Sequence, residues 1–190
     1  GLTAPMTVSA RVQESWKNSD ARRGDTWPQS DHITWTFPGT SMTEKDEITV
    51  EWFDGLFYPP AEAKQWYPGE TYPPESALMV GTEGAILIPN GGAPQLYPRE
   101  KFRGTAQPKL EPRNHYHHFL DAVLGTAENE SYFEQTGPMT EAILLGTVAI
   151  RTPDEKLEWD AAKLAITNNA PAHKLLKRDY REGWEVTGFS

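Results

Sequence analysis

Three of the chain's five histidines lie within four residues, in the stretch EPRNHYHHFLDAVLG at residues 111–125. Such a cluster is consistent with a metal site, with a substrate-binding or acid–base site, or with the polar start of an ordinary helix. Helical side chains advance by about 100° per residue, so His115 and His118 can share a ligand but His115 and His117 cannot. A zinc site needs one or two further ligands, and the sequence nominates none. The metal interpretation is therefore the weakest, and we predict no metal site. A substrate-facing histidine and an ordinary surface histidine both stay open, and His117 and His118 are assigned no role.

Arg113 and Asn114 come directly before this predicted helix. The first N–H groups of a helix favour anions and polar oxygens, so an Arg–Asn–His cluster suits a hydroxylated or carboxylated ligand. A simple helix cap explains Asn114 equally well. We take Arg113, His115 and Tyr116 as candidate substrate-binding residues.

A second candidate site is the stretch EWFDG at residues 51–55. Trp52 and Asp54 could present an aromatic face and a hydroxyl acceptor to a sugar. The alternative places Trp52 in the core and Asp54 in a hairpin turn, and for Trp52 we favour the core slightly. Further aromatic residues follow in a proline-rich loop, where they either cover a ligand or pack on a partner subunit: Phe57, Tyr58, Trp66, Tyr67 and Tyr72.

The sequence contains no G-x-G-x-x-G, no G-x-S-x-G and no Walker-type loop. Its carboxylates are numerous, but no pair stands out as a glycosidase dyad, because the spacing of such a pair is spatial. We therefore assign no catalytic residue and no cofactor-binding residue. Without any cysteine, the chain has no disulfide, no thiolate zinc site, no iron–sulfur cluster and no cysteine nucleophile.

Length and composition favour a folded globular protein. The 190 residues suffice for one domain, and 37% hydrophobic residues with seven Trp argue against disorder. A net charge of −9 disfavours nucleic acid and anionic membranes as partners. No apolar run reaches the roughly 18 residues of a membrane span, and no signal peptide is visible. The chain starts at Gly1 without an initiator Met, so we expect the natural N-terminus to lie upstream. Its compartment stays open.

The first half of the chain predicts an antiparallel sheet. Apolar residues alternate with polar ones over residues 6–13, 32–37 and 47–55, which is typical of strands with one buried face. Prolines exclude a regular helix or central strand over residues 56–76. A strand, a turn at residues 81–84 and a second strand follow, with further short strands at residues 94–98 and 156–160.

Three helices are predicted in the second half. Asn114 caps one that ends at Gly125, with Tyr116, Phe119, Leu120, Val123 and Leu124 along one side. The second spans residues 137–151 and is apolar nearly all round, hence buried; Gly146 inside it costs about 1 kcal/mol relative to Ala and indicates a close packing contact. The third spans residues 169–183, with Asn169 as its cap, Pro171 in its first turn and Gly183 as its end.

The order of these motifs resembles the C-terminal domain of the Gfo/Idh/MocA oxidoreductases, the relatives of glucose-fructose oxidoreductase and inositol dehydrogenase. The likeness rests on seven segments in order: GLTAPMTVSA, VEWFDGLFYPP, GTEGAIL with GGAPQLYP, HYHHFLDAVLG, GPMTEAILLGTVAIR, LEWDAAKLAITN and AHKLLKRDYREGWEV. It spans essentially all 190 residues and is closest to the predicted dehydrogenases of environmental bacteria. Single motifs are weak, and their order is the specific signal.

The resemblance implies an α+β fold, with an open, mainly antiparallel sheet and helices on one face, as in dihydrodipicolinate-reductase-like domains. It implies that residues 1–190 form one substrate-binding and oligomerising domain. In the family an N-terminal Rossmann domain binds NAD(P) and carries a catalytic Lys in a Glu-Lys-Pro motif, and an Asp-x-x-x-His motif supplies further groups. Neither motif occurs in this chain, and the second would fall shortly before Gly1.

Carried over by position, His115 and Tyr116 match the family's His-containing helix start, and Trp52 and Asp54 match its strand-end W-x-D-G. The chain departs from the pattern at His117 and His118 and in the loop at residues 56–76. We thus expect an inactive fragment of a bacterial NAD(P)-dependent sugar or polyol oxidoreductase, which self-associates through its sheet face and binds no cofactor itself. The alternative is a standalone carbohydrate-binding or assembly module.

Overall fold

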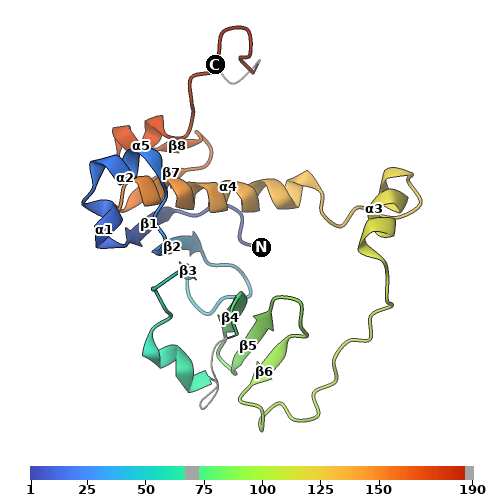
Figure 1. Ribbon diagram of the computed structural model, residues 1–190. Coiled ribbons are helices and arrows are strands. Elements are labelled where there is room, and N and C mark those ends of the chain that lie inside the picture. Colours follow the sequence, from blue (N-terminus) through green and yellow to red (C-terminus); the bar gives the residue numbers. More distant parts are fainter. Residues whose placement is uncertain (67–72, 187–190) are drawn as a thin grey trace. The chain divides into compact units, whose positions relative to one another are not determined.

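The computed structural model describes residues 1–66 and 73–186 (Figure 1). Contacts divide the chain into two compact units, one of residues 1–58 with 130–190 and one of residues 59–129. Unit 1 contains a five-stranded sheet in the order β3-β2-β1-β7-β8. Its strands are β1 (Thr7–Val12), β2 (Asp31–Pro38), β3 (Glu47–Phe53), β7 (Leu157–Asp160) and β8 (Ala165–Ile166). Every pairing within it is antiparallel.

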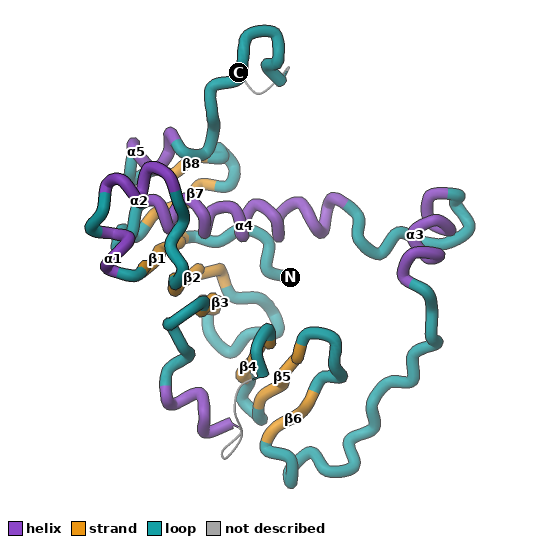
Figure 2. Tube along the Cα trace, in the orientation of Figure 1, coloured by secondary structure: helices purple, strands orange, loops and turns teal. Residues whose placement is uncertain are grey.

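One face of this sheet is buried because apolar residues alternate along its central strands. Val8, Ala10 and Val12 of β1 are buried together with three residues of β2, which are Ile33, Trp35 and Phe37. Helix α4 (Phe133–Arg151) packs on β1 and β2 and supplies the other half of the core (Figures 1 and 2). The predicted strands at residues 6–13, 32–37, 47–55 and 156–160 are thus confirmed to within two residues.

Gly146 of α4 lies against β2, as the sequence predicted. A Cβ atom at Gly146 would lie 2.6 Å from Trp35 Cζ2 and 3.2 Å from Ile33 Cδ1. One turn earlier, the buried indole N–H of Trp35 donates to the Ala142 carbonyl at 2.8 Å. The absence of a side chain therefore lets the tryptophan ring approach the helix backbone.

Helix α4 differs from its prediction in two respects. It begins at Phe133 rather than residue 137, so Pro138 lies inside the helix, where it has no N–H to donate to the Glu134 carbonyl. Its burial is confined to the second half, from Ala142 to Ile150, and the prediction of burial all round is wrong. Phe133, Met139, Ile143 and Leu144 are exposed because the sheet contacts only one side of the helix.

The remaining helices of unit 1 are short: α1 (Glu14–Lys17), α2 (Asp20–Asp25) and α5 (Ala170–Lys174). Asn169 caps α5 by accepting the Ala172 N–H at 2.9 Å, and Pro171 lies in its first turn, as predicted. The predicted end at Gly183 is wrong, because α5 stops at Lys174. None of residues 177–186 is buried, so no packing offsets the cost of extending the helix.

Unit 2 holds the three-stranded antiparallel sheet β4-β5-β6, formed by β4 (Ser76–Val80), β5 (Ala85–Pro89) and β6 (Gln95–Tyr97). All three strands were predicted. The loop over residues 56–76 contains a short 3₁₀ helix, η1 (Ala61–Trp66), which the sequence did not predict. Such a turn tolerates the preceding prolines, since Pro60 needs only its carbonyl to accept the Ala63 N–H at 2.9 Å. Tyr67 and Tyr72 of this loop lie outside the described residues.

Helix α3 (His115–Val123) completes unit 2 and has the predicted Asn114 cap. None of its residues is buried, and its apolar side is exposed along Tyr116, Phe119, Leu120 and Val123. The protein is therefore α+β with antiparallel sheets, as expected from the sequence. No helix in the described part of the chain is long and apolar enough to cross a membrane.

Candidate functional site

The predicted residues Arg113, His115 and Tyr116 come together at the start of α3, in unit 2. Asn114 Oδ1 accepts the N–H groups of Tyr116 and His117, both at 3.0 Å, which fixes the first turn. The rings of His115 and Tyr116 meet edge to face at 5.5 Å, and both side chains are exposed. Arg113 lies 3.4 Å from His118 Nε2. The turn therefore presents a guanidinium, an imidazole and a phenol to solvent.

The His118 ring contacts Arg113, although the helix spacing had indicated that it could share a ligand with His115. Among residues 1–66 and 73–186, no group of three or more His, Asp or Glu side chains is arranged to hold a metal ion.

Trp52 and Asp54 lie at the end of β3, in unit 1. Trp52 is 56% exposed, so the interpretation that it belongs to the core is wrong. It shares the face of Ile33, its partner across the sheet, but α4 packs on β1 and β2 and leaves the β3 edge open. Asp54 starts a turn, since Phe57 N–H donates to its carbonyl at 3.2 Å. The next strand belongs to another sheet, so the predicted hairpin is also wrong.

The turn at Asp54 is tied to the start of β2. Asp54 N–H donates to the Asp31 carbonyl at 2.9 Å, and Leu56 N–H donates to Ser30 Oγ at 3.0 Å. Gly55 has φ +64°, and a Cβ there would lie 2.2 Å from the Gln29 carbonyl oxygen. Only glycine fits this close approach. The backbone of Asp54 is thereby held beside the start of β2, and its carboxylate accepts the Gly55 N–H at 2.6 Å.

Asp31, the first residue of β2, is a buried carboxyl beside the turn at Asp54. Its side chain is buried at 7% exposure, and its Oδ1 atom has no hydrogen-bond partner in the described structure. Burial raises the pKa of this carboxyl, the nearby negative charge of Asp54 raises it further, and His32 lowers it. A carboxyl in this position holds its proton more readily than an ordinary aspartate.

On the sheet face opposite α4, the structure assembles a group that the sequence did not predict, the sheet-face cluster of Arg11, His32, Glu51, Phe53 and Phe57. The antiparallel register places Arg11, His32 and Phe53 in one row across three strands. The His32 ring stacks on Phe53 with centroids 4.3 Å apart, and its Nε2 atom lies 2.9 Å from Glu51 Oε1. Phe57 packs beside His32 at 6.4 Å, with the Arg11 guanidinium 5.6 Å from the Phe57 ring.

The sheet-face cluster can bind but shows no complete catalytic set. Its aromatic rings suit the apolar face of a sugar, and His32, Glu51 and Arg11 supply donors and acceptors for hydroxyl groups. Alternation indicated that His32 and Glu51 point away from the core. Their pairing depends on the register of β2 against β3, which the alternation leaves open.

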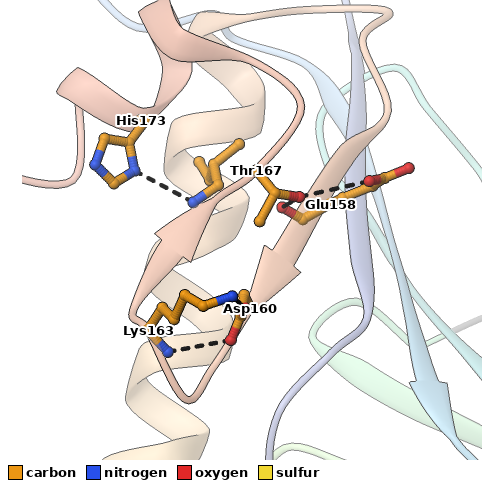
Figure 3. A network of polar contacts seen from close by, with 6 residues as sticks. Glu158, Asp160, Lys163, Thr167 and His173 are labelled. Atoms are coloured by element: carbon orange, nitrogen blue, oxygen red, sulfur yellow. Dashed lines mark hydrogen bonds and ion pairs between the residues drawn. The ribbon is translucent and has the colours of Figure 1, made fainter.

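A further polar network joins β7, β8 and α5 (Figure 3). Thr167 Oγ1 lies 3.4 Å from Glu158 Oε2, and His173 Nδ1 accepts the Ile166 N–H at 3.3 Å. Lys163 lies 2.7 Å from Asp160, and that hydrogen bond lowers the pKa of Asp160. These contacts close the turn between two strands and anchor α5, which accounts for them structurally.

No protein-family model matches the chain, and neither does any curated protein sequence.

Proposed function

We propose that this chain is the C-terminal, substrate-binding and oligomerising domain of a bacterial NAD(P)-dependent oxidoreductase of the Gfo/Idh/MocA family, acting on a sugar or polyol. The observation that carries the proposal is the end of β3, where Trp52 is exposed and Asp54 is held in place by the turn against Ser30 and Asp31. An aromatic face beside a fixed carboxylate is well suited to a sugar.

The local structures of the family-like motifs support the proposal. GPMTEAILLGTVAIR lies in the helix that crosses the antiparallel sheet, with its glycine against the sheet, and HYHHFLDAVLG forms a capped helix. An α+β scaffold of this kind is what the family's dihydrodipicolinate-reductase-like domain requires. In the proposal, Arg113, His115 and Tyr116 at the start of α3 are a separate set of candidate substrate-binding residues in unit 2. The sheet face opposite α4 forms the contact between subunits.

NAD(P) is the cofactor of the complete enzyme in this proposal. The chain has no G-x-G-x-x-G sequence, and the proposal assigns the dinucleotide to the N-terminal Rossmann domain. The expected contribution of this domain is to orient the sugar, and we derive no chemical step from its residues.

The test compares the product of the complete reading frame with the 190-residue chain. We expect the longer protein to bind NADH and to oxidise or reduce a sugar, and the 190-residue chain to do neither. Asp54→Asn and His115→Ala should each raise KM about tenfold or more in the longer protein, since each removes a hydrogen bond to a charged group or polar ligand. Asp46→Asn and His117→Ala are the matched controls and should leave KM unchanged.

Failure of the longer protein to bind NADH would refute the oxidoreductase assignment. Sugar binding by the 190-residue chain in that case would support the alternative, a standalone carbohydrate-binding module.

A further inference from the structure

A cluster of two arginines and two tryptophans lies at the end of α4, separate from every residue discussed above as a substrate site. This arginine–tryptophan cluster consists of Trp16 in α1, Arg23 in α2, Trp27 and Arg151. Trp16 is fully buried and donates its indole N–H to the Thr26 carbonyl at 3.3 Å. The guanidinium carbons of Arg23 and Arg151 lie 5.9 Å and 5.6 Å from the centre of the Trp16 ring. That of Arg151 also lies 3.9 Å from the Trp27 ring.

The two arginines are fixed by each other's backbone. Arg23 Nη2 donates to the Arg151 carbonyl at 3.4 Å, and Arg151 Nη1 donates to the Arg23 carbonyl. A guanidinium has five N–H donors in a rigid fork, so each arginine keeps donors that these bonds do not use. Contact with the shared Trp16 ring and the backbone bonds together restrain each guanidinium group, with little rotamer freedom left to lose on binding.

The two cations have no countercharge among the residues that the structure describes. Arg23 and Arg151 are half-buried, and neither forms an ion pair with any residue in the described ranges. The neighbouring Lys17, in contrast, pairs with both Glu14 and Asp154. The chain has 27 acidic against 18 basic residues, so a half-buried pair of cations without a carboxylate partner is not a consequence of composition. Two restrained cations on one ring, with no carboxylate partner among the described residues, favour a bound anion.

We propose that the arginine–tryptophan cluster is a binding site for a small molecule that carries an oxyanion, as a carboxylate, phosphate or sulfate group. Guanidinium forks bind such groups through two parallel N–H···O bonds, which a lysine cannot reproduce. Trp27 is 52% exposed, so its ring offers apolar surface to the rest of the ligand. A sugar acid or sugar phosphate combines both features. This site is independent of the oxidoreductase proposal, since it shares no residue with the proposed sugar site.

The experiment is a titration of the 190-residue chain at constant ionic strength, followed through the arginine Nε–Hε signals in ¹H–¹⁵N spectra. The added compounds are inorganic phosphate, glucuronate and glucose. We expect two arginine signals, absent in Arg23→Gln and Arg151→Gln respectively, to shift saturably with glucuronate and with phosphate at about millimolar concentration. Tighter binding of glucuronate than of phosphate identifies a sugar acid as the ligand, and equal binding identifies the oxyanion alone. Glucose should cause no shift.

The variants separate a binding site from a structural clamp. Arg151→Lys keeps the charge but loses the fork, and we expect it to weaken binding about tenfold while the chain stays folded by circular dichroism. The control is Arg181→Gln, which removes a single arginine 4.6 Å above the Trp184 ring and should leave binding unchanged. An absence of saturable shifts up to about 50 mM anion would overturn the proposal, as would an equal loss of binding in Arg181→Gln.

Discussion

Strands β2 and β3 pair along their whole length and carry the same alternation of apolar and polar residues, but only one of them is covered. On the α4 side of the sheet, Ile33, Trp35 and Phe37 of β2 are at most 8% exposed. Their partners across the sheet, Trp52, Val50 and Ile48, are partly or largely exposed, with Trp52 at 56% and Val50 at 37%. Alternation thus determines the face on which a side chain lies, and packing of another element decides whether that face is buried.

The cause of the difference is the position of α4. The helix packs on β1 and β2, and its Gly146 allows Trp35 to approach the helix backbone. β3 is an edge strand of this sheet. Its apolar residues are less buried than those of β2, because no helix of unit 1 covers them to the same extent. Exposed aromatic residues on an edge strand are common at binding surfaces, in agreement with the proposed role of Trp52.

Replacing one tryptophan on each strand gives the largest test of this comparison. Trp35→Ala should lower the free energy of unfolding of unit 1 by about 3–5 kcal/mol, because it leaves a cavity beneath α4 and removes the hydrogen bond to the Ala142 carbonyl. Trp52→Ala should change it by about 1 kcal/mol or less, since the side chain is already largely in solvent. Urea unfolding followed by circular dichroism measures both.

If Trp35→Ala does not fold, Trp35→Phe can be compared with Trp52→Ala instead. This variant keeps most of the ring and loses the 2.8 Å hydrogen bond, with an expected loss of about 1–2 kcal/mol. Equal effects at positions 35 and 52 would show that β3 is covered in solution.

Two glycines of α4 give a test of intermediate size. Gly146→Ala should destabilise by about 1–2 kcal/mol, because overlap with Trp35 and Ile33 exceeds the helix-propensity gain of about 1 kcal/mol. Gly137→Ala is the matched control within the same helix. Apart from its chain neighbours and the adjacent backbone of α4, no described atom lies within 4 Å of a Cβ at residue 137. We therefore expect no loss of stability, with the following Pro138 limiting any gain. Thermal unfolding measures the stability of the two variants. A more stable Gly146→Ala would contradict the close packing of Gly146 against Trp35 and Ile33.

Much of the local structure follows from short-range signals. Alternation located β1, β2 and β3, and cap residues located the starts of α3 and α5, because side-chain oxygens of Asn114 and Asn169 satisfy N–H groups within their own first turn. The packing contact of Gly146 followed from its unfavourable position inside a helix. Each of these inferences needs only residues that are neighbours in sequence.

The errors arise where distant residues decide the outcome. α5 is shorter than its polar sequence permits, because no core covers residues beyond Leu176, and the exposed half of α4 depends on where the sheet ends. The sheet-face cluster was missed for the same reason. Its His32–Glu51 contact joins residues on two strands, and a shift of register by one residue would separate them.

Two aspartates beside the β2–β3 corner give the smallest effect, as a dependence of stability on pH. Burial raises the pKa of Asp31 in the folded protein, so the folded state keeps this proton at pH values where the unfolded chain has lost it. The contribution of Asp31 to stability is therefore complete below its unfolded pKa of about 3.9 and is lost as the pH rises through the higher folded pKa. Asp31→Asn removes this loss, so relative to the unaltered chain it should be more favourable to stability at pH 7 than at pH 3.5. Asp54→Asn should act in the same direction and more weakly. It removes only the charge of Asp54, the second cause of the raised pKa of Asp31, and leaves the burial of Asp31, the first cause, in place. Urea unfolding of the three proteins at both pH values measures the difference. An unchanged pH dependence in Asp31→Asn would show that the buried carboxyl of Asp31 does not contribute to the pH dependence of stability.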